Sequence, residues 1–75
     1  MSDRLPALKP SQVIAALQKA GFHVARETGK HAILHRAGLP RPFPVPRHNK
    51  ELKRGTLLGI IKQAGLTSDE FRRYL

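Results

Sequence analysis

Hydrophobic positions near the start of the chain recur every three or four residues, which predicts an amphipathic helix. Its apolar face would consist of Val13, Ile14, Leu17 and Ala20. Pro10 suits the first helical position, although Lys9 is a poor N-cap and Ser11 is an alternative cap. We expect Gly21 to end the helix in the left-handed conformation, with Phe22 packing back on Leu17.

The hydrophobic spacing then changes to two, which is typical of β-strands. A first strand would place Phe22, Val24 and Arg26 on one face, followed by a turn at 27–30 in which Gly29 is available for positive φ. In a second strand, residues 31–36, Ala32 and Leu34 would point to one side, whereas His31, Ile33 and His35 would point to the other.

A third strand is expected at residues 43–47, after a loop at 37–42 rich in glycine and proline. Pro44 and Pro46 cannot donate to a hydrogen-bond ladder, so this strand should either lie at an edge of the sheet or turn these two positions outward from the ladder. Residues 48–52 lead into a second helix. Its buried side would consist of Leu57, Leu58, Ile60 and Ile61. Gly65 should end this helix as Gly21 ends the first.

A short last helix is predicted from Thr67, because Thr67 and Glu70 form a capping box and Leu66 and Phe71 a hydrophobic staple. The order is therefore α-β-β-β-α. Two helices on one face of a three-stranded antiparallel sheet would make one α+β domain over residues 1–75, with residues 1–8 as a loose tail.

The charge of the chain points to a polyanionic partner. Fourteen Lys and Arg against five Asp and Glu give a formal net charge of +9 over 75 residues. Eight basic residues and one acid, Glu51, lie between residues 30 and 62. Such a charge attracts phosphate backbones or anionic membranes, and a merely soluble surface is the alternative.

Other functional classes find no support in the composition. The absence of cysteine excludes disulfides and thiolate metal sites. No apolar run suggests a signal peptide or a bilayer span, so we expect a cytoplasmic protein without a membrane partner. His31 and His35 would lie about 13 Å apart on a strand, too far to share a metal ion. We therefore expect neither a metal nor a small-molecule cofactor.

A histidine among cations suits the cleavage of RNA, which carries its own nucleophile in the ribose 2′-hydroxyl. Histidine titrates near neutral pH and can act as general acid or base, while Lys and Arg stabilise negative charge on phosphate. Lys30-His31 fits this chemistry, although a surface histidine at a strand end is the alternative reading. The sequence does not assign a second proton-transfer group; His48 is the better candidate and His35 the next.

The start of the second helix is the other candidate element. Helix N-termini bind phosphate through free N–H groups and the helix dipole. Cations placed there work against helix stability, which favours a functional role. Together with the turn and the third strand, this region supplies the candidate phosphate-binding residues Lys30, Arg47, His48, Lys50, Lys53 and Arg54. The few aromatic residues look buried, so a base-stacking aromatic platform is not expected.

Taken in order, several segments resemble the HicA toxins. They are Leu17–Phe22, Gly29–His31, Val45–His48, Leu52–Leu57 and Ile60–Leu66. The resemblance implies a fold like the double-stranded RNA-binding domain and a prokaryotic mRNA interferase whose catalytic residue is His31. It also implies a HicB-like antitoxin that covers the active site. Where the family usually has Gly-Ser-His this chain has Gly-Lys-His, so Lys30 replaces a hydroxyl with a charge.

Three functions therefore remain in view, the third being a pure interaction protein that an acidic partner neutralises. The favoured one is a metal-independent endoribonuclease, the toxin of a toxin–antitoxin system, that cleaves mRNA with His31. The alternative is a non-catalytic module that binds structured RNA, which would rest on the fold and the charge alone.

Overall fold

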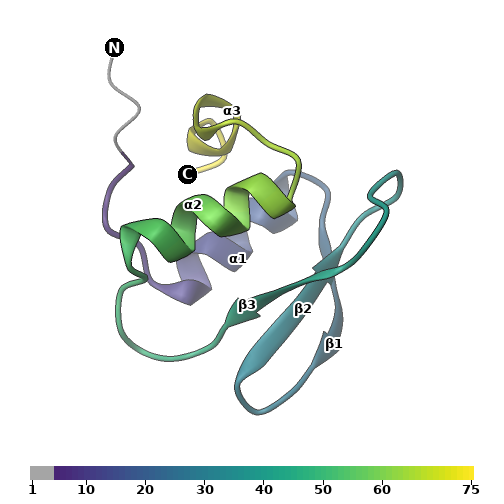
Figure 1. Cartoon of the computed structure of the whole chain (residues 1–75), viewed down its shortest axis with the longest axis horizontal. Helices are drawn as coiled ribbons and strands as arrows, with labels where there is room; N and C mark the ends of the chain where they lie inside the picture. The colour runs from purple at the N-terminus through teal and green to yellow at the C-terminus, as the bar shows by residue number, and fades with distance from the viewer. Residues whose placement is uncertain (1–4) are drawn as a thin grey trace.

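A computed structural model describes residues 5–75 of the chain, and Figure 1 shows its arrangement. The elements follow the predicted order, with a short third helix at the end. They are α1 (Pro10–Lys19), β1 (His23–Glu27), β2 (His31–His35), β3 (Phe43–Pro46), α2 (Arg54–Gln63) and α3 (Ser68–Arg72). The strands form one antiparallel sheet in the order β1-β2-β3. The α+β class and the topology predicted from the sequence are confirmed.

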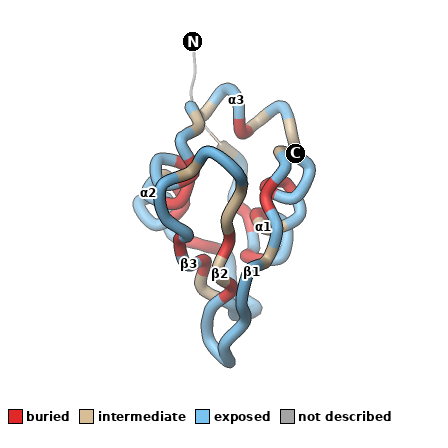
Figure 2. The backbone as a smooth tube through the Cα atoms, turned by 90° about the vertical axis from the view of Figure 1, so that its right-hand side faces the viewer, coloured by how far each residue is buried: buried red, intermediate tan, exposed pale blue. Residues whose placement is uncertain are grey.

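The core lies between the helices and one face of the sheet, where the buried segments of Figure 2 converge. Ala32 and Leu34 of β2 and Val45 of β3 are fully buried, as the alternating pattern predicts. Phe22 and Phe43 meet edge to face, with ring centroids 5.6 Å apart. Within the described residues, each helix is too short and too polar to cross a bilayer.

The predicted helix ends are confirmed in detail. After α1, Gly21 has φ of 100°, and the Phe22 N–H donates to the Leu17 carbonyl over 3.0 Å. After α2, Gly65 has φ of 76° and the equivalent bond follows it. Both ends are Schellman motifs. The helix α3 begins at a complete capping box in which Thr67 and Glu70 bond to each other's backbone N–H.

Four sequence-based expectations need correction, the first concerning the tail. Residues 1–4 of the expected tail lie outside the described part of the chain. The rest is not loose, because Leu8 is 5% exposed in the core and Leu5 packs against it. The Leu52 N–H donates to the Leu8 carbonyl over 2.8 Å, which ties this segment to the approach to α2.

The second correction concerns α2, where Leu58 is only half-buried while Leu57, Ile60 and Ile61 are buried as expected.

The other two corrections concern β1 and the turn after it. The β1–β2 register shifts between Val24 and Arg26, so Val24 faces Leu34 whereas Arg26 faces Ile33. This bulge moves Arg26 to the opposite face from Val24, because one extra residue inverts the alternation. Gly29 also lies outside the positive-φ region that we expected it to use.

The helix ends give a stability prediction. Gly21→Ala should lower the free energy of unfolding by about 1–2 kcal/mol, because alanine is strained at positive φ. Gly59→Ala is the matched control, since Gly59 is helical and an added Cβ there meets nothing within 4 Å. It should raise stability by about 0.5–1 kcal/mol. Urea denaturation of both variants checks this, and shifts of the same sign would contradict it.

Candidate functional site

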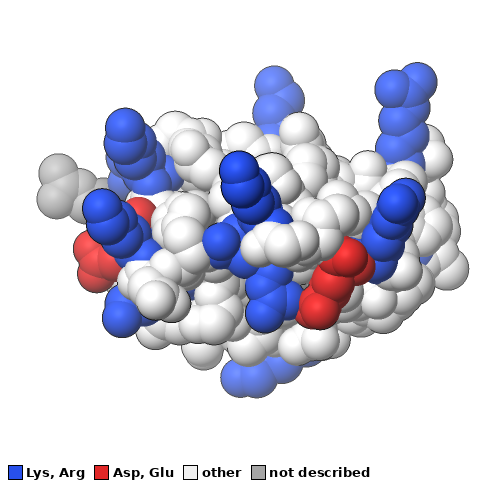
Figure 3. Space-filling model, turned by 90° about the horizontal axis from the view of Figure 1, so that it is seen from below, with Lys and Arg blue, Asp and Glu red and all other residues white. Residues whose placement is uncertain are grey.

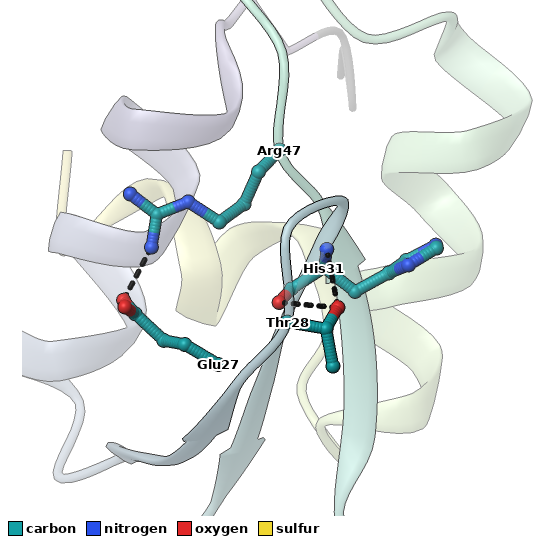
Figure 4. Close-up of polar contacts among 4 residues, drawn as sticks. All are labelled: Glu27, Thr28, His31 and Arg47. Carbon is teal, nitrogen blue, oxygen red and sulfur yellow. Dashed lines mark hydrogen bonds and ion pairs between the residues drawn. The ribbon is translucent and has the colours of Figure 1, made fainter.

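The turn between β1 and β2 holds the backbone of His31 through a threonine side chain. The Thr28 hydroxyl accepts from the His31 N–H at 3.0 Å and lies 3.2 Å from the His31 carbonyl, to which the Thr28 N–H donates at 2.9 Å (Figure 4). In a common β-turn a backbone carbonyl would accept from the His31 N–H. On the other side, the Arg47 N–H donates to the Lys30 carbonyl over 2.8 Å. The start of β2 is thus fixed to both neighbouring strands.

The exposed side chain of His31 faces α2 (Figure 4). His31 stands opposite Pro46 in the β2–β3 register and lies on the side of the sheet away from buried Ala32. There it lines a hollow of about 220 Å³ between β3 and α2. The full lining consists of His31, Pro44, Pro46, Gly55, Thr56, Gly59, Ile60 and Gln63. His31 is the only histidine among these lining residues, and it has the one imidazole that could transfer a proton there.

The beginning of α2 meets this hollow through Gly55 and Thr56. Its N-cap, Lys53, makes no side-chain capping bond, and the first turn contains no acidic residue. In contrast, Gln12 accepts from the Lys9 N–H at the start of α1, and α3 has its capping box. The α2 N-terminus therefore offers uncapped N–H groups and a positive dipole end to an anion beside His31.

The predicted phosphate-binding residues do not all lie together. Lys30, Lys50 and Lys53 are exposed, on the turn before His31 and on the approach to α2. Arg54 lines a separate hollow with Leu5 and other residues of the N-terminal segment.

Arg47 and His48 line another hollow, of about 350 Å³, beside the start of α1. Arg47 points toward α1 and pairs with Glu27, whereas His31 points toward α2 (Figure 4). His48 accepts from the Lys50 N–H at 3.1 Å through Nδ1. This hollow shares no lining residue with that of His31, so Arg47 and His48 lie outside the histidine site.

The remaining two histidines are paired across the sheet, His35 at the end of β2 and His23 at the start of β1. His35 packs edge to face on His23, with centroids 6.0 Å apart, and its Nε2 lies 3.0 Å from the Leu39 carbonyl. Neither lines the His31 hollow. Over residues 5–75, no cluster of three or more His, Cys, Asp or Glu is placed to hold a metal ion.

Lys and Arg side chains are spread over the face in Figure 3, with few acidic ones between them. Not every cation is available to a ligand. Arg36 is partly buried, donates to the Ala20 carbonyl at 3.0 Å and stacks over the Phe22 ring. Its charge stabilises the C-terminal end of α1.

Sequence reasoning did not identify several residues of the site. Thr28 was assigned only to a turn, and Gln63 and Gly59 only to a helix. Gly59 could have been singled out from the sequence, because a glycine inside a helix lowers its stability and therefore indicates a packing or functional role. Pro44 and Pro46 were recognised as edge residues, but their place beside α2 depends on packing between distant segments.

Comparison with known families adds an independent line of evidence. A family model described as the HicA toxin of bacterial toxin–antitoxin systems matches residues 10–66, from α1 to the residue after Gly65. A search of curated proteins gives no match. The matched segment covers most of the chain and includes the complete histidine hollow. The chain therefore belongs to the HicA toxin family of bacterial toxin–antitoxin systems.

Proposed function

We propose that the chain is a metal-independent endoribonuclease that cleaves mRNA in the cytoplasm, with His31 as its catalytic base. The observation that carries the proposal is the exposed His31 side chain in a hollow beside the uncapped N-terminus of α2. Family membership supports a toxin, and the net charge of +9 supports a polyanionic substrate.

The reaction follows from the groups that meet in this hollow. Neutral His31 takes the proton of a ribose 2′-hydroxyl, and the 2′-oxygen attacks the adjacent phosphorus. The bond from phosphorus to the 5′-oxygen breaks, and this oxygen takes a proton from water. The hydroxide that remains takes the proton from the imidazolium of His31, which restores the base. The products are a 2′,3′-cyclic phosphate and a 5′-hydroxyl. N–H groups at the start of α2 stabilise the charge that develops on phosphate.

The other candidate residues act as RNA contacts in this proposal. Lys30, Lys50 and Lys53 attract the backbone close to the cut, and Lys30 lies directly before the catalytic residue. Arg47, His48 and Arg54 lie in other hollows and would hold phosphates farther along the strand. A HicB-like antitoxin is the proposed partner, and it would inhibit by covering the His31 hollow.

His31→Ala should abolish both growth arrest on expression and cleavage of RNA in vitro. His31 is exposed, so the variant should keep the circular dichroism spectrum and melting temperature of the wild type. RNA that is shifted on a gel by the wild type but never shortened would instead favour the non-catalytic RNA-binding module.

Wild-type cleavage should persist in excess EDTA. The nucleophile is part of the RNA, and the proton transfer and charge stabilisation come from His31 and α2. Following the length of a labelled RNA with and without the chelator checks this. If cleavage stops in EDTA and returns with added divalent cation, the proposed chemistry is wrong.

Thr28 should act as a positioning residue. Thr28→Val keeps the shape but removes the hydroxyl that accepts from the His31 N–H, so kcat should fall about tenfold. Thr28→Ser keeps the hydroxyl and should restore most of kcat. A purely structural role would give the two variants equal kcat below their melting temperatures, whatever their stabilities.

A further inference from the structure

The hollow beside His31 has more apolar surface than a phosphate site needs. Pro44 and Pro46 line it from β3 and Ile60 lines it from α2, while Thr56 and Gln63 add polar groups. Phosphate oxygens prefer N–H groups and cations, whereas proline rings and an isoleucine suit the flat face of a nucleobase. The lining therefore fits a ligand with an apolar face and a polar edge.

Two glycines keep this hollow open. Gly55 and Gly59 lie one helical turn apart on α2, and an added Cβ at either position would meet nothing within 4 Å. Neither uses positive φ. The packing of the chain thus gives no reason for glycine at these positions, although glycine weakens a helix relative to alanine. Both glycines line the hollow, so a side chain added at either position would lie at its wall.

We propose that this hollow binds one unpaired nucleobase next to the cleaved phosphate, so that the chain cuts single-stranded RNA. This inference rests on the proposed nuclease function and names its substrate class. A base in an A-form duplex is stacked and paired, and it cannot enter a hollow between a strand and a helix. The Gln63 amide can donate to and accept from the edge of the base, which makes it the residue that sets base preference.

The test fills the hollow without disturbing the fold. Gly59→Leu projects a side chain into it, and Gly59→Ala projects a methyl group. Ala15→Leu is the matched control, because Ala15 is an exposed position of α1 outside every hollow described above. Each variant is tested on a single-stranded oligoribonucleotide and on the same strand annealed to its complement. Binding is measured with His31→Ala as background, so that it does not depend on cleavage.

Gly59→Leu should melt no lower than the wild type, yet its kcat/KM on the single strand should fall about 10- to 100-fold. The kcat/KM of Gly59→Ala should lie between those of Gly59→Leu and the wild type, and the kcat/KM of Ala15→Leu should match that of the wild type. None of the variants should cut the duplex. Cleavage by a folded Gly59→Leu at the wild-type rate, or equal cleavage of the duplex, would overturn the subsite and leave the nuclease intact.

The binding measurement separates the two proposals. If the wild type cuts nothing but the Gly59→Leu substitution weakens binding of the single strand, the base subsite stands and the nuclease proposal fails. If neither cleavage nor single-strand binding occurs in the wild type, both fail. A third outcome is that the wild type binds the single strand without cutting it and that the Gly59→Leu substitution leaves this binding unchanged. Both the nuclease proposal and the base subsite are then wrong.

Discussion

Burial of Ala32 and Leu34 determines where the side chain of His31 points. Both side chains are fully buried, and the alternation of a strand then turns His31 to the opposite face of β2. A slip of one residue in register would exchange the two sets. The hydrophobic core and the site are therefore set by the same pairing of β2 with its two neighbours. Any change that weakens this register would move the imidazole and expose the core together.

The proline-rich edge strand completes the site without weakening the sheet. The Arg47 N–H donates to the Lys30 carbonyl, toward β2. The backbone nitrogens of Pro44 and Pro46 lie at the positions of opposite direction, which face away from β2, so the two prolines remove no hydrogen bond from the β2–β3 ladder. An edge without these donors is poorly suited to pair with another strand. In this chain α2 packs against β3 instead, and the prolines become one wall of the histidine hollow.

Local features were predictable from the sequence, and features that combine distant segments were not. Gly21, Gly65 and Thr67 were assigned correctly because a cap is decided within a few residues. The bulge between Val24 and Arg26 has no comparably short signal, and the burial of Leu8 depends on Leu52, far along the chain. The motif resemblance singled out His31, and the structure places this residue in a hollow. The sequence puts His31, Arg47 and His48 in one basic region, and only the fold shows that Arg47 and His48 line a different hollow.

The central claim is that the imidazole of His31 takes the proton of a ribose 2′-hydroxyl. The most direct measurement is mass spectrometry of the products from an oligoribonucleotide and from the same strand with a single 2′-deoxy nucleotide at the cut position. The account predicts a 2′,3′-cyclic phosphate, or the 3′-phosphate it hydrolyses to, with a 5′-hydroxyl on the other fragment, and no cleavage at the deoxy position. Fragments that carry a 5′-phosphate, or cleavage that persists at the deoxy nucleotide, would contradict it.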